Sequence, residues 1–368
     1  MADGIPGDRQ EADPLTILVP TCNRPQFLAR LLNYYSACGA PFPLHVLDSS
    51  QEPFADREPQ ALSRSPNIVY ARYDPHLMPM PKLSEGLQRV TTPYVVFWGD
   101  DDLMVPRSLG RAVRFLEDHQ DFSLAHGTGG LFEVAVVKRH HVLMQMGPLP
   151  QRSYTEETAS ARLLRFMAQG CSLFHSVQRT ASLRRNVAQC VAHGFGYYWA
   201  ERALAFLALV QGKAKALDGL YIARQVHGGQ ASRDLQERFD CFDWMSSEDF
   251  PKRYQAFRTS VSQALAAQDG ISMSEARELV KRAVWSQCAK GLSSAWQDRY
   301  SVKPSGVRLR AAVRRLPGVR QVSQWLRWMG VPPDGNPISV PGLLRPASPH
   351  RGDFLQVYRA VRTAAWAP

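Results

Sequence analysis

The sequence TTPYVVFWGDDDLMVP, residues 91–106, is the most informative part of this 368-residue chain. Its apolar run 94–98 is rich in β-branched and aromatic residues, which predicts a strand buried on both faces. Three carboxylates, Asp100, Asp101 and Asp102, follow after one glycine. Adjacent aspartates repel one another and lose hydration when they are partly buried, so we expect cationic groups against them. The alternative interpretation is a solvated acidic turn before a helix that begins at Pro106.

This acidic cluster also has a preferred type of metal. Oxygen ligands at the carboxyl end of a parallel strand favour a hard divalent cation, Mg²⁺ or Mn²⁺, which keeps coordination positions open for substrate phosphates. The sequence therefore predicts a cation site that works together with a phosphate-bearing ligand.

Length and composition set limits on the rest of the chain. The chain is long enough for one large domain and a smaller one, and its apolar content of 45% excludes wholesale disorder. Six scattered cysteines without a CxxC pair predict reduced thiols in a cytoplasmic protein rather than disulfides or a zinc site. The first fourteen residues are polar, so we expect no signal peptide. The chain contains no run of eighteen apolar residues, so we also expect no membrane-spanning helix.

The positive charge is concentrated in one segment. Of a net charge of +11, seven positive residues lie within 301–330, where there is no acid: Lys303, Arg308, Arg310, Arg314, Arg315, Arg320 and Arg327. Such a segment indicates an anionic partner, either phospholipid or nucleic acid. Tryptophans beside the arginines favour amphipathic helices at a membrane interface, so we predict peripheral membrane contact through residues 303–329. We expect no nucleic-acid partner, because no recognised module accompanies the arginines. The alternative is a helical subdomain that exposes these arginines to water.

The first fifty residues predict a βαβ unit. Residues 15–21 form an apolar strand, and a helix follows in which Asn23 is the expected cap and Pro25 lies in the first turn. Residues 44–47 begin a second strand that ends at Asp48. This order requires a parallel sheet with a right-handed crossover.

The remaining periodicity continues the α/β pattern and then becomes helical. Strands are expected at 67–73, 122–125, 173–177 and 217–224, with a hairpin of 131–137 and 141–146, and helices at 82–90, 106–119, 156–167 and 199–210. The approach HLMPMP is too rich in proline to be helical. Helices are again expected at 250–266 and 272–291. We therefore divide the chain into a disordered N-terminus (1–13), a catalytic domain (14–234), a C-terminal helical region with a basic amphipathic segment (235–330) and an extended or loosely docked Pro/Gly-rich tail (331–368).

Polar residues gather where the predicted strands end. In an open parallel sheet the ligand lies beyond the carboxyl ends of the strands. Asp48 could there accept hydrogen bonds from a base or a ribose. Arg24, Lys82 and Arg224 could offset the charge of a diphosphate.

Three ordered segments together are recognisable. ILVPTCNRPQFLARLL (17–32), LDSS (47–50) and VVFWGDDD (95–102) resemble the nucleotide-sugar-binding half of glycosyltransferases with the GT-A fold, and family 2 most of all. The resemblance is clear over residues 15–104 and weaker as far as 227. It implies an α/β fold of the GT-A type, Rossmann-like, with a mostly parallel sheet flanked by helices. It also implies nucleotide contacts at Thr21, Asn23 and Arg24, base recognition by Asp48, and metal–diphosphate binding by Asp100 and Asp102. Asp101, which lies between the last two, is predicted to belong to the same donor site.

The same resemblance points to two residues further along the chain. The family places an acidic catalytic base at the start of a helix that faces the acceptor, and Glu201 stands in this order, although the preceding residue is Ala200 rather than a second acid. Glu201 is also the only acid between Thr158 and Asp218, so burial could raise its pKa for a specific task. The alternatives are a helix N-terminal acid or a structural partner of Arg202. His227 takes the position of a late metal-ligating histidine, with an ordinary loop residue as the alternative.

These observations predict a metal-dependent glycosyltransferase. It would move a sugar from a nucleotide-sugar donor to a glycan or lipid-linked acceptor, with inversion at the anomeric carbon. Retention is the alternative outcome, because the sequence does not fix where the acceptor lies. Two alternatives remain: a nucleotidyltransferase-like enzyme, which would be expected to carry a Gly-rich phosphate loop where this chain has TCNRPQF, and a catalytically silent GT-A scaffold.

Overall fold

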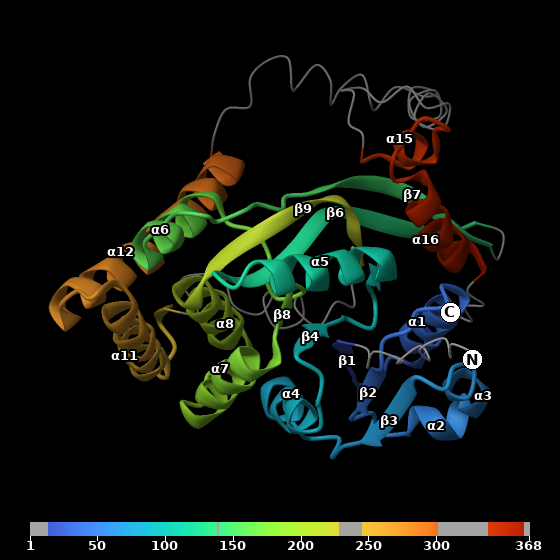
Figure 1. The fold of residues 1–368 in the computed structure, drawn as a ribbon, viewed down its shortest axis with the longest axis horizontal. Coiled ribbons are helices and arrows are strands. Elements are labelled where there is room, and N and C mark those ends of the chain that lie inside the picture. Colours follow the sequence, from blue (N-terminus) through green and yellow to red (C-terminus); the bar gives the residue numbers. More distant parts are fainter. Residues whose placement is uncertain (1–13, 138–139, 228–244, 301–337, 364–368) are drawn as a thin grey trace, which may run out of the picture.

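The computed structural model describes residues 14–137, 140–227, 245–300 and 338–363. Their centre is a nine-stranded sheet with the strand order β3-β2-β1-β4-β8-β6-β9-β5, in which β7 pairs with β6 (Figure 1). The strands are β1 (Leu15–Thr21), β2 (Leu44–Asp48), β3 (Ile68–Arg72), β4 (Tyr94–Phe97), β5 (Leu103–Met104), β6 (Phe122–Val137), β7 (His140–Leu149), β8 (Val177–Arg179) and β9 (Lys213–Gln225). Six of them, β1 to β4, β6 and β9, run in one direction, which confirms the predicted mostly parallel sheet.

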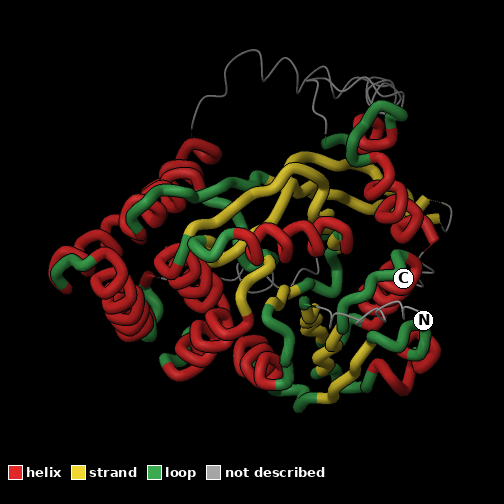
Figure 2. The backbone as a smooth tube through the Cα atoms, viewed as in Figure 1, coloured by secondary structure: helices red, strands yellow, loops and turns green. Residues whose placement is uncertain are grey.

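Helices cover this sheet, as the tube view in Figure 2 shows. They are α1 (Pro25–Ala37), α2 (Phe54–Arg57), α3 (Pro59–Leu62), α4 (Pro79–Gln88), α5 (Pro106–Asp118), α6 (Ala159–Gln169), α7 (Thr180–Ala192), α8 (Tyr197–Gln211), α11 (Phe250–Asp269), α12 (Met273–Tyr300), α15 (Val340–Leu344) and α16 (Arg351–Thr363). Strands alternate with helices through the first two thirds of the chain, which is the mixed α/β architecture that the sequence predicts.

The core lies in two layers, one on each face of the sheet. Along β4 the side chains of Val96 and Trp98 enter one layer, with α1, α5 and α16, while those of Val95 and Phe97 enter the other, with α4, α6, α7, α8, α11 and α12. Because successive side chains of a strand point to opposite faces, this run is apolar at every position. The prediction that residues 94–98 are buried on both faces is confirmed.

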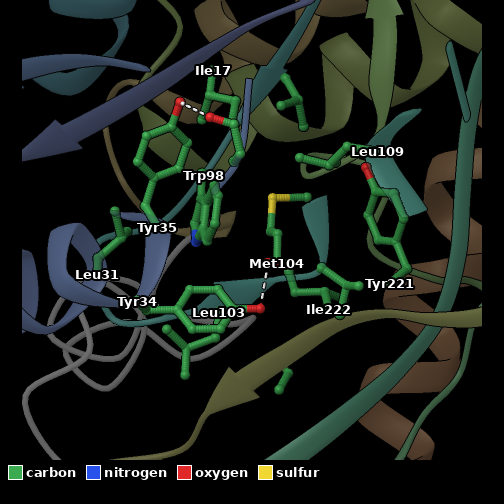
Figure 3. Close-up of a cluster of buried hydrophobic side chains, with 14 of the residues drawn as sticks. Ile17, Leu31, Tyr34, Tyr35, Trp98, Leu103, Met104, Leu109, Tyr221 and Ile222 are labelled. Atoms are coloured by element: carbon green, nitrogen blue, oxygen red, sulfur yellow. Dashed lines mark hydrogen bonds between the residues drawn. The ribbon is translucent and has the colours of Figure 1, made fainter. Parts of the chain in front are cut away.

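Two buried tyrosines of α1 help to position the loop after β4. Figure 3 shows Tyr34 and Tyr35 packed with Trp98, Leu103 and Met104 in the first core layer. The Tyr34 hydroxyl donates a hydrogen bond of 3.0 Å to the Met104 carbonyl oxygen, and Tyr34 and Trp98 meet edge to face. The apolar residues that follow the aspartates therefore anchor the acidic loop to α1.

Four local predictions were wrong. The strand expected at 173–177 begins only at Val177, because β8 spans Val177–Arg179. Proline does not prevent a helix in HLMPMP, because α4 begins at Pro79, and a first helical turn needs no intrahelical N–H donors. The glycine-rich run 126–130 does not end a strand, since β6 continues through it with register shifts at Gly127 and Thr128. Asn23 does not cap α1, because its backbone is left-handed with φ 55° and Arg24 takes the cap position.

The expectation of an extended or loosely docked C-terminal tail was also wrong over residues 338–363. Helix α16 packs against α1 and β7 (Figure 1). Its residues Phe354, Val357 and Val361 recur at helical spacing and are buried in the first core layer. The predicted domain boundary near residue 235 and the basic segment 303–329 lie outside the described residues.

Candidate active site

The ends of β1, β2, β4 and β9 lie close together and carry most of the residues that the sequence singles out. Thr21, at the end of β1, donates a hydrogen bond from Oγ1 to Asp100 Oδ2 over 2.8 Å, although 79 residues separate the two. Ser49, just after β2, donates its N–H to the Thr21 carbonyl oxygen. The parallel strands β2, β1 and β4 are adjacent, so their carboxyl ends meet at one edge of the sheet.

Arg24 is the main cationic partner of the acidic loop. Its Nη1 lies 2.6 Å from Asp100 Oδ1 and its Nη2 lies 2.9 Å from Asp101 Oδ2. The same Nη2 is 3.1 Å from His227 Nε2, and the guanidinium lies over the Phe27 ring. The prediction of cationic groups against the aspartates is thus confirmed, and a solvated acidic turn is excluded because all three carboxylates are buried.

Arg30 is a second cation at this loop, and the sequence analysis missed it. It is buried, and its guanidinium donates 2.6 Å to the Asp101 carbonyl oxygen and 2.5 Å to Gln225 Oε1 at the end of β9. Burial lowers the pKa of Arg30 to about 10. The available signal was an arginine on the otherwise apolar face of α1 that Phe27 and Leu31 share.

Asp102 is held by β9. Its carboxylate accepts hydrogen bonds from Arg224 Nε over 3.2 Å and from the Gln225 N–H over 3.1 Å. The Trp98 indole N–H donates to the backbone carbonyl oxygen of Asp102. Burial raises the pKa of Asp102 to about 7, and Arg224 offsets only part of that rise. Loss of hydration is therefore the dominant influence on this carboxylate.

The neighbouring aspartates differ in their pKa values. Burial raises the pKa of Asp100 to about 6, although the charge of Arg24 opposes the shift. Burial would also raise the pKa of Asp101, but the hydrogen bond from His227 and the charge of Arg24 outweigh it, so that this pKa lies below its ordinary value. The loop thus holds one firmly ionised carboxylate between two that ionise reluctantly.

Asp48 is fully buried at the end of β2. Its carboxylate accepts the N–H of Ser50 over 2.7 Å, the N–H of Phe54 over 2.9 Å and the Tyr70 hydroxyl over 2.7 Å. Burial alone would raise the pKa of Asp48, but these hydrogen bonds outweigh it and the pKa lies below its ordinary value. Asp48 therefore holds the turn after β2 in place, in addition to its predicted role in recognising the nucleotide base.

Lys82 and Asn23 support the same loops. Lys82 Nζ donates to the Thr21 carbonyl oxygen over 2.8 Å and to Ser49 Oγ over 2.7 Å, and burial lowers its pKa. Asn23 donates its N–H to Ser50 Oγ and accepts the Gln51 N–H at Oδ1, each over 2.8 Å. Both residues link the end of β1 to the turn after β2, close to the acidic loop.

His227 lies beside Asp101. Its Nε2 is 3.0 Å from Asp101 Oδ2, and its ring stacks on Phe27 with ring centroids 4.7 Å apart. The structure thus brings His227 to the acidic loop, as the sequence predicts. His126 is a different case: it is buried, its Nε2 is bonded to the Arg152 carbonyl oxygen, and none of its described contacts is with the acidic loop.

His175 is a second histidine at the loop, and the sequence analysis did not select it. It precedes β8, its Nδ1 is 2.9 Å from the Phe97 carbonyl oxygen, and its Nε2 is 3.7 Å from Asp102 Oδ2. Burial, together with the nearby charge of Arg224, lowers the pKa of His175 to about 3, so the ring is neutral. No sequence signal distinguishes it, because only the pairing of β8 with β4 brings it to the aspartates.

Glu201 lies on α8 and is half-buried. The helix begins at Tyr197, two residues earlier than predicted, so Glu201 is in its second turn. Burial raises the pKa of Glu201, while Arg224 and Arg202 oppose the rise. The charge of Arg224 therefore opposes the rise in pKa at both Glu201 and Asp102.

The predicted metal ligands do not form a three-residue cluster. In the part of the chain that the structure describes, no group of three or more His, Cys, Asp or Glu side chains is arranged to hold a metal ion. Asp100 is turned towards Thr21 and Arg24, and His227 towards Asp101. Carboxylate oxygens and imidazole nitrogens are nevertheless ligands that suit Mn²⁺, and a cation that also binds substrate phosphates needs only one or two protein ligands.

Two further sequence predictions can be compared with the described residues. The cysteines among them, Cys22, Cys38, Cys171, Cys190 and Cys288, are free thiols. None of the described helices is long and apolar enough to cross a membrane.

Comparisons with known proteins agree with this architecture. Residues 16–191, just under half of the chain, match the family Glycosyl transferase family 2. Among solved structures, TarS 1–349 of S. aureus in complex with UDP-GlcNAc is similar at 14% identity and a TM-score of 0.50, over 95% of this chain and 90% of that one. At this identity the likeness establishes the fold. Glucosyl-3-phosphoglycerate synthase of Mycobacterium tuberculosis, crystallised with Mn²⁺ and UDP, aligns over 70% of this chain and 80% of that one at 13% identity, but its TM-score of 0.36 is too low to support an argument. No curated protein sequence matches the chain.

Proposed function

We propose that this chain, whose residues 16–191 match Glycosyl transferase family 2, is a nucleotide-sugar-dependent glycosyltransferase of the GT-A fold. It would transfer the sugar to a glycan or lipid-linked acceptor with inversion, aided by a divalent cation. One observation carries this proposal. The acidic loop, Arg24 just before α1 and Arg224 on β9 come from three parts of the chain and meet at the carboxyl edge of the sheet, and the charge of Arg224 also opposes the rise that burial causes in the pKa of Glu201 on α8. This is where an open α/β sheet binds its ligand.

The donor half of the site lies over β1 and β2. We assign nucleotide recognition to Asp48, Thr21 and Asn23, and charge compensation of the diphosphate to Arg24 and Lys82. The last two residues already lie against Asp100 or the end of β1, so their charges are held in place before the donor binds. Prearranged cations stabilise a leaving group more than mobile ones, because they need not reorganise during the reaction.

The cation would be held by Asp102 and Asp100 and by a histidine, for which the sequence suggests His227. Asp101 contacts both Arg24 and His227 and so keeps these two residues close to the other aspartates. When bound, such a cation supplies Lewis-acid stabilisation of the diphosphate. The buried carboxylates fit this task, since Asp100 and Asp102 ionise reluctantly and an added positive charge would favour their ionised forms.

Glu201 is the proposed general base. It accepts the proton of the acceptor hydroxyl as that oxygen forms a bond to the anomeric carbon, and the bond from this carbon to the diphosphate oxygen breaks. Arg224, whose Nε lies 3.2 Å from Asp102 Oδ2, stabilises the charge that develops on the departing diphosphate. Displacement from the opposite side converts an α-linked sugar nucleotide into a β-linked product. Peripheral attachment to an anionic membrane through residues 303–329 remains part of the proposal and would bring a lipid-linked acceptor close to the site.

A thermal-shift screen tests the donor site. UDP-, GDP-, CMP- and dTDP-sugars are each added with Mn²⁺ and with EDTA, since a ligand of the native state raises the melting temperature according to its concentration over its dissociation constant. A metal-dependent shift with one nucleotide supports the proposal and identifies the base. No shift with any donor would instead favour a catalytically silent scaffold. Free nucleoside triphosphates are added in a parallel series, and a shift with these alone would favour a nucleotidyltransferase-like enzyme.

A further inference from the structure

Helix α16 carries a row of exposed arginines, Arg351, Arg359 and Arg362, beside the apolar face that docks it on α1 and β7. We propose that this arginine row binds the headgroups of an anionic phospholipid bilayer. Helix α16 would then be a second membrane contact, in addition to residues 303–329. The inference rests on the proposed function in one respect only, namely that the enzyme attaches to an anionic membrane, and it requires nothing of the sugar transfer.

The three arginines lie on one side of the helix. An α-helix turns by about 100° per residue, so the row spans about 80° around the axis and about 16 Å along it. All three residues are exposed. The row therefore presents its guanidinium groups together to one surface outside the protein.

Two half-buried apolar residues complete the same side of α16. Leu355 and Tyr358 lie between or next to the arginines around the helix. The guanidinium of Arg362 lies over the ring of Tyr358, 5.6 Å from its centroid. Arginine and tyrosine each combine an apolar body with a polar end, so they suit the boundary between acyl chains and headgroups. This mixture favours a bilayer over a polyanion dissolved in water, which would use the arginines alone.

The charge of this C-terminal part of the chain is almost entirely positive. Residues 338–363 include four arginines and one acid, Asp353. Asp353 is half-buried and lies more than about 100° around the helix from each arginine of the row. The attraction of the row to an anionic surface is therefore not cancelled within α16, and each arginine close to such a surface adds roughly fivefold to the affinity.

The arginine row also lies close to the predicted membrane segment. Residues 301–330 hold seven cations and no acid, and α15 follows at Val340. In Figure 1 the end of α12 at Tyr300 and helix α15 both lie along the upper edge of the described chain. The basic segment therefore leaves and rejoins the described chain on one side of the molecule, where α15 packs against α16. One bilayer on that side can meet the basic segment and α16 together.

The docking of α16 does not use the arginine row. A separate apolar face of the helix is buried in the first core layer. On another side, Gln356 Oε1 accepts a hydrogen bond of 3.1 Å from the thiol of Cys38, just after α1. A bilayer can therefore bind the row while α16 stays in place, and substitution of the arginines should leave the fold intact.

Co-sedimentation of the full chain with phospholipid vesicles tests the proposal. The vesicles contain phosphatidylcholine alone or phosphatidylcholine with phosphatidylglycerol, each at about 0.1 M and about 0.5 M salt, because salt screens exposed charges. The row variant combines Arg351→Gln, Arg359→Gln and Arg362→Gln. Thermal unfolding shows that each variant is folded. Binding to duplex DNA is measured in parallel, since DNA is the other polyanion that the arginines could contact.

Two further variants separate the row from positive charge in general. The matched control combines Arg64→Gln, Arg185→Gln and Lys252→Gln, which remove the same charge from exposed positions near α3, α7 and α11. These helices lie on the lower side of the molecule in Figure 1. The second variant changes the seven cations of residues 303–327 to Gln and tests the proposed attachment of the basic segment on its own.

We expect wild type to bind the anionic vesicles at low salt, the row variant to bind them at least about tenfold more weakly, and the matched control to stay within about twofold of wild type. Equal binding by the row variant and wild type, or equal losses in the row variant and the control, would overturn the inference. Binding of wild type to DNA but not to anionic vesicles would overturn it as well.

The same measurements keep this inference distinct from the proposed function. If only the variant of residues 303–327 loses vesicle binding, the role of α16 is excluded while the proposed attachment stands. The thermal shift with nucleotide sugars reports on the donor site independently of any vesicle. If the row variant does not fold, Arg351→Gln and Arg362→Gln decide singly, each with roughly fivefold weaker binding expected and unchanged binding as the contrary result.

Discussion

Arg24 Nη1 lies 2.6 Å from Asp100 Oδ1, so an ion pair joins the start of α1 to the loop after β4 across 76 residues. Both side chains are largely buried. Removing one partner of such a pair leaves the other charge without compensation in a poorly hydrated place. The pair thus couples the geometry of the donor site to the stability of the fold.

Replacement of Arg24 should therefore be costly. We expect Arg24→Ala to lower the free energy of unfolding by about 3–5 kcal/mol, because it leaves Asp100 and Asp101 without their shared guanidinium. Chemical denaturation measures the change. The matched control is Arg57→Ala, which breaks an exposed pair with Glu52 and should cost less than about 1 kcal/mol. Equal effects of the two variants would show that the Arg24 pair has no special structural role.

Asp102→Asn should separate metal binding from folding. The folded-state pKa of Asp102, about 7, is above its unfolded value, so the folded state binds more protons and stability falls as the pH rises towards 7. The neutral amide removes this penalty, and we expect the variant to be at least as stable as wild type at pH 8. It should nevertheless lose the Mn²⁺-dependent thermal shift with donor, as should Asp102→Ala. A normal metal-dependent shift in either variant would exclude Asp102 as a ligand.

Asp48→Asn should show the opposite dependence on pH. The folded-state pKa of Asp48 is lowered, so its ionised form stabilises the protein above the unfolded pKa, and this contribution is lost as the pH falls through the folded pKa. At pH 7 the variant should lose about 1–3 kcal/mol, because an amide cannot accept all the hydrogen bonds from Ser50, Phe54 and Tyr70. Denaturation at several pH values should show the difference from wild type narrowing on acidification. A difference that stays constant down to pH 2 would contradict this assignment.

Glu201→Gln should retain donor binding and lose transfer. Loss of a general base reduces the turnover number by about 10²–10⁴-fold. Because the pKa of Glu201 is raised and the base must be ionised, the turnover of wild type should fall on acidification at a pH above the ordinary glutamate value. Glu157→Gln, on the exposed surface, is the control and should leave the profile unchanged. Unchanged transfer in Glu201→Gln would remove Glu201 from the mechanism.

Most strands and helices followed from local pattern, whereas β5 and α7 were not predicted and β8 begins where the predicted strand 173–177 ends. β1 and β2 were predicted almost to the residue, because Leu15, Ile17 and Leu44 belong to short apolar runs that end in polar residues. Local pattern failed where tertiary packing overrides propensity. The glycines of β6 remain in a strand because β9 and β7 pair with it on both sides, and α16 forms in a Pro/Gly-rich segment because α1 and β7 offer it an apolar surface.

The sequence by itself determined the order of the elements, the two-sided burial of β4 and the three aspartates at its end, since these depend on residues that are neighbours along the chain. Only the tertiary structure decided which groups neutralise those aspartates. Arg30 lies 71 residues from the Asp101 carbonyl oxygen to which it donates, Arg224 contacts the Asp102 carboxylate from 122 residues away, and no spacing along the chain indicates either contact. The physical reason is that a buried charge is stabilised by whichever donors the packing of strands and helices brings within about 3 Å, and sequence separation has no influence on that distance.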